Sequence, residues 1–311
     1  MEKLSVVIPC FNEEQTIKPF IKAMMKIEQV MSRELIFEYL FVNDGSSDKT
    51  LDVLKSEANS KDNINYLSFS RNFGKESALL AGLEKATGDY ITVMDVDLQD
   101  PPELLPKMYN KIKEGYDIVG TYRKDRVGEP PIRSFFSKMF YKLINSVSDT
   151  KMVEGARDYR LMTRQVVDSV LELKEVNRFS KGLFSWVGYD TTYISFDNRE
   201  RVAGETSWSF WSLLKYSLEG FINFSEALLN IATASGIISF ISSIVGIVFI
   251  IIRKLTIGGS VNGWASMVVM MLFIGGIQLL CLGILGKYIS KIFLETKKRP
   301  SYFIKETNLD D

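Results

Sequence analysis

Two carboxylates and an amide follow a short apolar run in the first half of the chain. The run 90–94 leads directly into Asp95, Asp97 and Gln99. Residues two apart in a strand point to the same side, so Asp95 and Asp97 would place two carboxylates on one face. Carboxylates that close need a cation between them, and oxygen ligands without histidine or thiolate suit Mg²⁺ or Mn²⁺. The pattern predicts a site for a metal ion and a diphosphate.

An exposed acidic loop that begins a helix is the ordinary alternative. Asp100 is followed by Pro101 and Pro102, and both residue types are common at helix starts. Short patterns such as Asp-x-Asp also have many accidental matches. Taken alone, the tripeptide favours this loop, and the rest of the chain must decide.

The composition restricts the chemistry that is available. Lys plus Arg and Asp plus Glu each number 38 in 311 residues, whereas a duplex nucleic-acid binder would be strongly basic. The absence of histidine excludes histidine-based nucleophilic systems, His-ligated zinc and an imidazole base. Only two cysteines, Cys10 and Cys281, are present, which indicates no disulfide framework. Chemistry must rest on carboxylates, Lys, Arg and metal.

Apolar runs alternate with patterns of helical period along the first part of the chain. The runs, typical of strands covered on both faces, occupy residues 4–9, 36–42, 64–69, 89–94 and 117–122. This alternation predicts a doubly wound, mostly parallel α/β sheet of the Rossmann-like kind.

Three polar turns follow strands of this predicted sheet. They are residues 9–13, 43–48 and 95–100, and ligands of such sheets bind outside the carboxyl ends of the strands. We therefore expect the turns to converge on one crevice. Neither a Gly-x-Gly-x-x-Gly nor a Walker loop follows the first strand, which weighs against a dinucleotide oxidoreductase or a phosphate-loop ATPase. Metal and basic side chains would have to hold the diphosphate.

The last third of the chain is apolar. Residues 227–252 and 255–286 carry no charge, and each run exceeds the roughly 20 residues that cross a bilayer. We predict membrane helices at about 230–252 and 264–286. No signal-peptide pattern precedes the first predicted strand, so we expect the first domain to stay where it is made, in the cytoplasm.

Basic residues predict the orientation of the two spans. The loop between them holds Arg253 and Lys254, and five further bases flank the far end of the second span: Lys287, Lys291, Lys297, Lys298 and Arg299. This asymmetry places both termini in the cytoplasm. Two further segments, residues 130–144 and 210–224, are amphipathic. The first fits a helix on the membrane surface and a helix packed on the sheet equally well. The aromatic residues of the second favour the water–lipid boundary.

A soluble α/β domain tethered by two membrane helices suggests a reaction between a soluble donor and a lipid acceptor. A lipid phosphate has a second pKa near about 6 and is largely dianionic at neutral pH, so it can attack without a general base. A departing nucleoside diphosphate needs stabilisation by a divalent ion and by cations such as Arg123 or Arg201.

Several motifs in order carry a resemblance to the polyprenyl-phosphate glycosyltransferases of glycosyltransferase family 2, which include dolichyl-phosphate mannose synthase and the bacterial undecaprenyl-phosphate glucosyltransferases. The motifs are 9–13, 42–48, 71–75, 95–99, 155–162 and 203–206. The similarity covers nearly the whole chain. It implies an inverting enzyme of the GT-A fold that moves one sugar from a nucleotide-sugar onto a polyprenyl phosphate at the cytoplasmic face.

The resemblance also implies roles for individual residues. The nucleotide-sugar would be bound by Pro9, Phe11, Glu13, Val42, Asp44, Lys75, Asp95, Val96 and Arg123. Asp97 and Gln99 would ligate Mg²⁺ or Mn²⁺, and Arg133 and Arg201 would bind the acceptor phosphate. Asp97, Asp158 and Arg201 would form the catalytic set, although a structural salt bridge explains Asp158 equally well. Phe11 and Asn43 depart from the frequent Tyr and Asp of the family.

The resulting expectation is transfer of a hexose, preferably glucose from UDP-glucose, to undecaprenyl phosphate for cell-envelope glycosylation. A GDP-mannose-dependent dolichyl-phosphate mannose synthase-like enzyme and a catalytically inactive membrane scaffold are the alternatives. A processive polysaccharide synthase would have a Gln-x-x-Arg-Trp motif and more spans, and neither is found. The product would need a separate flippase. Resemblance and small residues in the apolar segments suggest a homo-oligomer.

These expectations divide the chain into four parts. Residues 1–207 would form the cytoplasmic GT-A domain, 208–229 amphipathic interfacial helices, 230–290 the two-helix membrane region and 291–311 a cytoplasmic tail. The protein would be a multi-pass protein of the cytoplasmic membrane.

Overall fold

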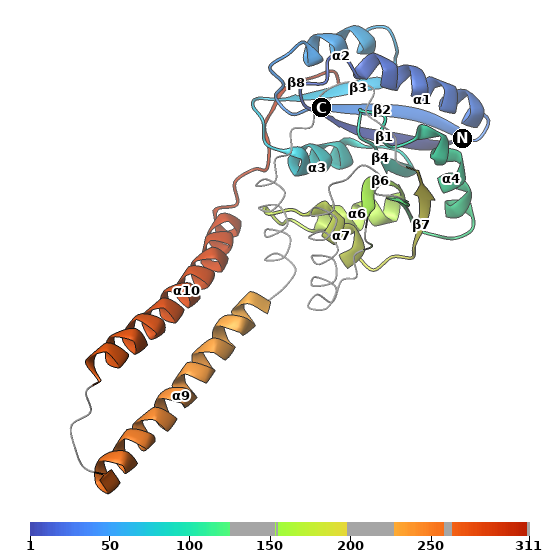
Figure 1. Ribbon diagram of the computed structural model, residues 1–311. Coiled ribbons are helices and arrows are strands. Elements are labelled where there is room, and N and C mark those ends of the chain that lie inside the picture. The colour runs from blue at the N-terminus through green and yellow to red at the C-terminus, as the bar shows by residue number, and fades with distance from the viewer. Residues whose placement is uncertain (125–152, 154, 198–226, 258–262, 310–311) are drawn as a thin grey trace. The chain divides into compact units, whose positions relative to one another are not determined.

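The computed structural model describes residues 1–124, 153, 155–197, 227–257 and 263–309. It contains two compact units (Figure 1), of which the first comprises Met1–Gly220 with Arg299–Asp311 and the second Phe221–Lys298. The predicted amphipathic segment 130–144 and nearly all of the predicted interfacial segment 208–229 lie outside the described residues.

The first unit is built on one twisted sheet. Its described strands follow the order β7-β5-β6-β4-β1-β2-β3-β8 (Figure 1). Their bounds are β1 (Glu2–Cys10), β2 (Leu35–Asn43), β3 (Ile64–Phe69), β4 (Tyr90–Val93), β5 (Ile118–Arg123), β6 (Ala156–Thr163), β7 (Thr191–Phe196) and β8 (Ile304–Thr307). The strands β3, β2, β1 and β4 are mutually parallel, which confirms the predicted doubly wound half.

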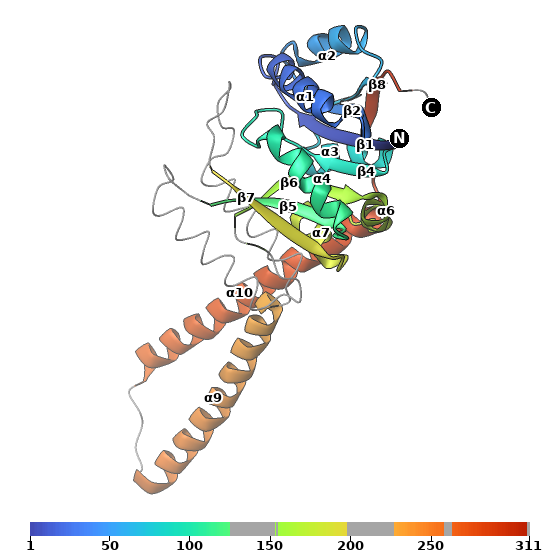
Figure 2. The same ribbon diagram turned by 90° about the vertical axis from the view of Figure 1, so that its right-hand side faces the viewer.

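Helices cover both faces of this sheet. They are α1 (Ile17–Met31), α2 (Thr50–Ala58), α3 (Lys75–Lys85), the short η1 (Pro102–Leu104), α4 (Leu105–Lys113), α6 (Arg164–Glu172) and α7 (Ser180–Trp186). Alternate residues of β1 enter two different cores: Ile8 packs with Phe20 of α1, and Val7 packs with Ala78 of α3. Figures 1 and 2 accordingly place α1 and α3 on opposite sides of the sheet. Burial on both faces explains why β1 reads as a continuous apolar run.

One strand inside the sheet departs from the parallel pattern. The predicted strand at 117–122 exists as β5, but β6 lies between it and β4 and is antiparallel to both. The charges at alternate positions of residues 155–162 predict a short strand, and β6 confirms it. Because β6 is internal, the alternative that this segment is a sheet edge is wrong. Its charged residues Arg157 and Asp158 are thereby placed near Asp95, which follows β4.

The C-terminal segment adds a further antiparallel strand that the sequence pattern does not predict. Strand β8 pairs with β3, and the Tyr302 ring stacks on Phe69 with ring centroids 4.9 Å apart. The Tyr302 hydroxyl donates to Glu84 of α3, and the Asn308 side chain accepts from the main-chain N–H of Tyr66 at 2.7 Å. Residues expected to form a simple tail thus belong to the first unit.

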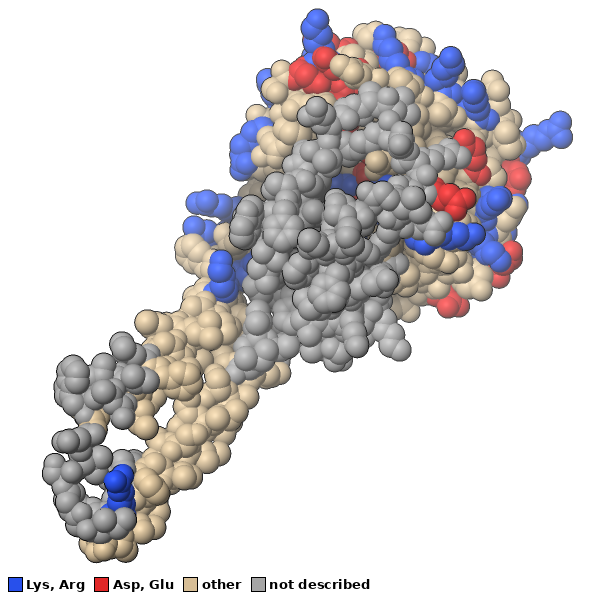
Figure 3. All heavy atoms as spheres, in the orientation of Figure 1, with Lys and Arg blue, Asp and Glu red and all other residues tan. Residues whose placement is uncertain are grey.

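The second unit consists of α9 (Ala227–Ile257) and α10 (Trp264–Lys297). Both are long and apolar enough to cross a membrane: the spans Ala232–Arg253 and Phe273–Lys297 have mean hydropathies of 2.6 and 1.6. Their apolar side chains are exposed, including Ile238, Phe249 and Leu279. Figure 3 shows that most of their visible surface carries no charge. A soluble helix would bury such a surface, so this exposure favours a lipid environment.

The β8 contacts generate a stability prediction. We expect Tyr302→Ala to lower the free energy of unfolding by about 2 kcal/mol, because a stacked ring and a hydroxyl hydrogen bond are lost together. Thermal unfolding of the detergent-solubilised chain measures this as a lower Tm. The control is Lys305→Ala, which removes an exposed side chain of β8. Equal Tm values for the two variants would contradict a stabilising role of the Tyr302 contacts.

Candidate active site

The turns after β1 and β2 meet at the carboxyl ends of the strands, as predicted. Strand register pairs Cys10 with Asn43, so the two strands end level with each other. Beyond this point the Asn12 N–H donates to the Ser46 hydroxyl at 2.9 Å, and the Ser47 N–H donates to the Asn12 side chain at 2.9 Å. Asn12 itself has a φ of +56°, a left-handed conformation that asparagine tolerates better than most residues. The two polar turns form one continuous rim.

Asp44 connects this rim to the loop before α3. Its carboxylate accepts hydrogen bonds from the main-chain N–H groups of Phe73 at 2.6 Å and Gly74 at 2.9 Å. Burial raises the pKa of Asp44, and these two hydrogen bonds oppose the rise. Next to it, Gly45 has a φ of +65°, and a Cβ there would collide with the main chain of Arg71. The turn and the loop can approach this closely only with glycine.

The residue Asn43, which departs from the usual family pattern, has a local structural role. Its side-chain amide donates to the Ser68 hydroxyl on β3 at 2.9 Å, and its side-chain oxygen accepts from the Ser46 N–H at 3.2 Å. Asn43 is buried. An amide satisfies a donor and an acceptor at this position without burying a charge.

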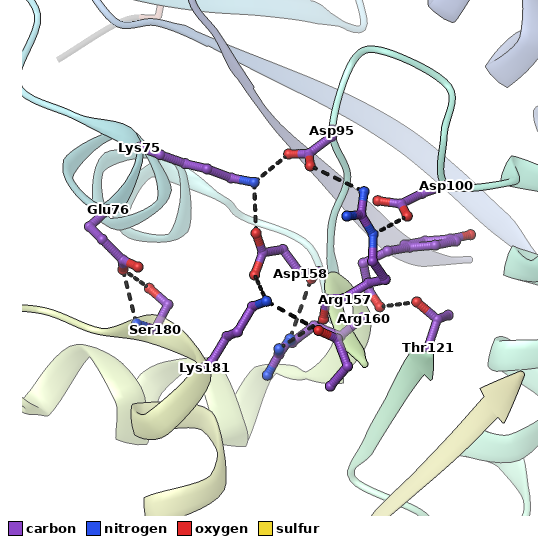
Figure 4. A network of polar contacts seen from close by, with 12 residues as sticks. Lys75, Glu76, Asp95, Asp100, Thr121, Arg157, Asp158, Arg160, Ser180 and Lys181 are labelled. Carbon is purple, nitrogen blue, oxygen red and sulfur yellow. Dashed lines mark hydrogen bonds and ion pairs between the residues drawn. The ribbon is translucent and has the colours of Figure 1, made fainter. Parts of the chain in front are cut away.

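Lys75 joins two carboxylates from separate strands (Figure 4). It is the first residue of α3, and its Nζ lies 2.6 Å from Asp95 Oδ1 and 2.7 Å from Asp158 Oδ2. Asp95 follows β4, whereas Asp158 lies on β6. These ion pairs bring together three residues that the resemblance assigned to the site.

Arg157 forms the other half of the charge network. Its Nε donates to Asp100 Oδ1 at 2.9 Å, and its guanidinium lies 3.8 Å from Asp95 Oδ2. The interpretation of Asp100 as only a helix cap is incomplete, because its side chain is fully buried against Arg157 and makes no capping hydrogen bond to the following η1 helix. Figure 4 shows both arginine contacts around Asp95 and Asp100.

Burial and ion pairing act in opposite directions on the pKa values here. Burial alone would raise the pKa of Asp158, but the ammonium groups of Lys75 and Lys181 outweigh it and hold that pKa well below its ordinary value. Burial would likewise lower the pKa of Lys75, but Asp158 and Asp95 reverse the effect and raise it. Asp158 and Lys75 therefore stay charged across the physiological pH range.

The Asp97–Gln99 turn supplies oxygen atoms suited to a divalent ion. Asp97 is buried, with 3% of the residue exposed, and its Oδ1 accepts from the Gln99 N–H at 3.1 Å. Leu98 between them has a φ of +56°, an uncommon conformation for a bulky residue and one that recurs at functional turns. Arg123 donates to the Gln99 side-chain oxygen at 3.0 Å, so this predicted donor-binding residue does lie beside the predicted metal ligands.

These donors fit a metal ion that has few protein ligands. Among the described residues, no group of three or more His, Cys, Asp or Glu side chains could by itself hold a metal. Mg²⁺ and Mn²⁺ commonly take one or two carboxylate ligands and complete their coordination with substrate phosphates and water. Asp97 and Gln99 meet that requirement, and a closed structural metal site is not indicated in this part of the chain.

The remaining predicted residues fall into three groups: residues at the rim, residues buried in the cores, and residues outside the described part of the chain. Phe11 is 44% exposed at the rim, next to the half-buried Pro9, while the Glu13 N–H donates to the Thr50 hydroxyl. The side chains of Val42 and Val96 are buried in the cores, so only their main chains can contact a ligand. Arg133 and Arg201 lie outside the described residues.

The sequence alone does not identify four residues of the polar network in Figure 4: Glu76, Arg157, Ser180 and Lys181. The alternating charges of 157–160 were a usable signal for Arg157. No comparable signal marks Glu76 and Ser180, whose hydrogen bonds link positions 104 residues apart.

This mostly parallel sheet, with an Asp-x-Asp turn at its carboxyl edge, defines a GT-A type of transferase domain. The model of glycosyl transferase family 2 matches residues 5–171, more than half of the chain, and the protein belongs to that family. It is a glycosyltransferase. The family assignment confirms the predicted enzyme class and fold.

Relatives match over almost the full length. The chain is 42% identical over 98% of its length to the putative glycosyltransferase CsbB of Bacillus subtilis, covering 92% of that protein. It is 42% identical over 97% of its length to the prophage bactoprenol glucosyl transferase homolog of Escherichia coli, covering 98% of that protein. The bactoprenol glucosyl transferase of Shigella phage SfX is also 42% identical, over 97% of this chain and 99% of the relative.

Among solved structures, glucosyl-3-phosphoglycerate synthase from Mycobacterium tuberculosis aligns with a TM-score of 0.46 and 18% sequence identity. The alignment covers 70% of this chain and 76% of that one.

The depressed pKa of Asp158 generates a pH prediction. In an unfolded chain the pKa of an aspartate is about 4, whereas in the folded protein the pKa of Asp158 is lower. The ionised Asp158 therefore contributes its full stabilisation above about pH 4, and this contribution is lost as the pH falls further. We expect the Tm of the wild type to fall more steeply than that of Asp158→Asn between about pH 5 and about pH 3. Parallel Tm curves would show that the Asp158 ion pairs do not stabilise the fold. Asp168→Asn, at an exposed aspartate of α6, is the control.

Proposed function

We propose that the protein transfers a hexose, preferably glucose from UDP-glucose, to undecaprenyl phosphate at the cytoplasmic face of the membrane. The observation that carries this proposal is the extent of the match to proteins named bactoprenol glucosyl transferase. At 42% identity it spans 303 or 304 residues, so it includes the apolar helices α9 and α10 as well as the acidic site. A soluble acceptor would require neither helix.

The membrane arrangement follows from the two helices. In this proposal α9 and α10 span the bilayer, and residues 1–207 together with the C-terminal segment lie in the cytoplasm. Strand β8 supports that assignment, because it is part of the same sheet as the acidic site. The N-terminal domain and the segment after α10 must then be on the same side of the membrane. Product use on the other side would require a separate flippase.

The reaction itself is a displacement at the anomeric carbon. An acceptor phosphate oxygen attacks that carbon and forms the new bond, while the bond to the β-phosphate oxygen of the donor breaks and the nucleoside diphosphate leaves with the electron pair. Attack opposite the leaving group inverts the configuration. A phosphate dianion carries no proton that must be removed, which accounts for a chain without histidine.

The described side chains divide the remaining tasks. Asp44 would accept a hydrogen bond from an N–H edge of the nucleobase, and two main-chain donors hold its carboxylate in place for this role. Asp97 and Gln99 would hold Mg²⁺ or Mn²⁺, which neutralises negative charge on the diphosphate when bound. Lys75 fixes Asp95 and Asp158 in place before the donor arrives. A preorganised set of charges lowers the barrier more than one that must rearrange.

Product formation tests the proposal directly. We expect purified wild-type protein with Mn²⁺, a polyprenyl phosphate and a panel of nucleotide-sugars to form a lipid-linked hexose, detected by mass spectrometry, with the highest rate from UDP-glucose. GDP-mannose in the same panel tests the mannosyl-transfer alternative. Absence of lipid-linked sugar with every donor would refute the proposed function.

Substitution of the metal-binding carboxylate tests the site. We expect Asp97→Asn to lower the turnover rate by at least about 100-fold, because the amide is a weaker ligand and leaves the diphosphate charge less compensated. The matched control is Asp52→Asn, at an exposed aspartate of α2. A wild-type rate in Asp97→Asn would remove Asp97 from the mechanism, and an unchanged Tm excludes misfolding as the cause of a loss.

A further inference from the structure

The first turn of α3 contacts the beginning of α7 as well as the acidic cluster. Glu76, directly after Lys75, accepts hydrogen bonds from the main-chain N–H of Ser180 at 2.9 Å and from the Ser180 hydroxyl. Ser180 is buried and Glu76 is half-buried. Burial raises the pKa of Glu76, while the Ser180 hydrogen bonds oppose the rise. Figure 4 shows this link on the opposite side of Asp158 from Arg157. The start of α7 is thereby fixed relative to Lys75.

Lys181 is the residue that this link positions. Its Nζ lies 3.9 Å from Asp158 Oδ1 and donates to the main-chain carbonyl of Ala156 at 3.1 Å. Its side chain is 28% exposed. At 3.9 Å the contact with Asp158 is an electrostatic pair and not a hydrogen bond, so the ammonium group has donor capacity beyond its bond to Ala156.

The neighbouring cations are more tightly engaged. Lys75 makes two contacts shorter than 2.8 Å to carboxylates, and Arg157 makes a hydrogen bond to the buried Asp100. Arg160 turns back onto the main chain, where it donates to the carbonyl groups of Asp158 and Arg157, and its guanidinium lies 4.2 Å from the centre of the Phe184 ring. Arg160 is also buried, with 6% of the residue exposed. Of these cations, Lys181 is the one that is partly exposed and can gain a phosphate oxygen without giving up a short carboxylate contact.

We propose that Lys181 is a phosphate-binding residue of the active site and that Glu76 is a positioning residue that acts through Ser180. This inference rests on the proposed function, which supplies two phosphate groups: the donor diphosphate and the phosphate of the lipid acceptor. An ammonium group binds a phosphate oxygen as a compact point charge. The two phosphate sources are separated by experiment.

Binding and kinetics with the full-length protein in detergent test the proposal. The affinity for UDP with Mn²⁺ is measured by calorimetry, and KM is measured for UDP-glucose and for the polyprenyl phosphate. We expect Lys181→Gln to weaken one of these phosphate ligands by about tenfold, as loss of a charge-assisted hydrogen bond predicts. Lys181→Arg should recover most of the loss because it keeps the positive charge. The matched control is Lys174→Gln, an exposed lysine shortly before α7.

The two phosphate sources give different signatures. Weaker UDP binding with a higher KM for UDP-glucose assigns Lys181 to the donor diphosphate. Unchanged UDP binding with a higher KM for the lipid phosphate assigns it to the acceptor. Ser180→Ala and Glu76→Ala should reproduce the same signature more weakly, since both act on the position of Lys181 and leave its charge intact.

The outcomes that overturn the proposal are distinct from failure of the proposed function. Affinities and KM values of Lys181→Gln within about twofold of the wild type would show that Lys181 binds no phosphate. Equal losses in Lys181→Gln and Lys181→Arg, together with a lower Tm in both, would show a structural role only. If the wild type forms no lipid-linked sugar, the proposed function fails, and calorimetry with UDP and with farnesyl phosphate still decides whether Lys181 binds phosphate.

Discussion

Charge compensation of carboxylates that converge at one edge of the sheet is the constraint on which this structure depends. Asp95 and Asp158 come from different strands, and Lys75 lies within hydrogen-bond distance of both. Without a cation between them, two partly buried carboxylates would repel each other, and one would take up a proton. The same lysine begins α3, so the position of this helix on the sheet and the geometry of the acidic cluster are set together.

The beginning of α3 serves three parts of the site at once. Main-chain N–H groups immediately before the helix bind Asp44 at the rim formed by the turns after β1 and β2, Lys75 joins the two carboxylates, and Glu76 holds the start of α7. A shift of this turn would therefore move the rim, the acidic cluster and Lys181 together. The other end of α3 contacts the segment before β8, where the Tyr302 hydroxyl donates to Glu84. A chain without histidine achieves its preorganisation with fixed charges instead of a tuned general base.

Local patterns predicted the parts of the fold that depend on local chemistry. The apolar runs located β1 to β5, the Asp-x-Asp turn located Asp95 and Asp97, and the uncharged runs located α9 and α10. Contacts between distant residues were not predictable in this way. Asp100 resembles a helix cap because two prolines follow it, and only its pairing with Arg157, 57 residues later, reveals a buried ion pair. Similarly, the pattern at 155–162 predicts a strand but not its place between β4 and β5, and β8 becomes a strand through a partner that its own sequence does not specify.

The most direct test of the central interaction is a double-mutant cycle of Lys75 and Asp158, measured as kcat/KM for the nucleotide-sugar. Lys75→Met leaves Asp95 and Asp158 without their shared cation, and Asp158→Asn leaves Lys75 paired with Asp95 alone. If this ion pair organises the active site, the loss of transition-state stabilisation in the double variant is smaller than the sum of the losses in the two single variants. The expected difference is more than about 1 kcal/mol. Additive losses, equal within about 0.3 kcal/mol, would show that the two residues act independently and would contradict the account.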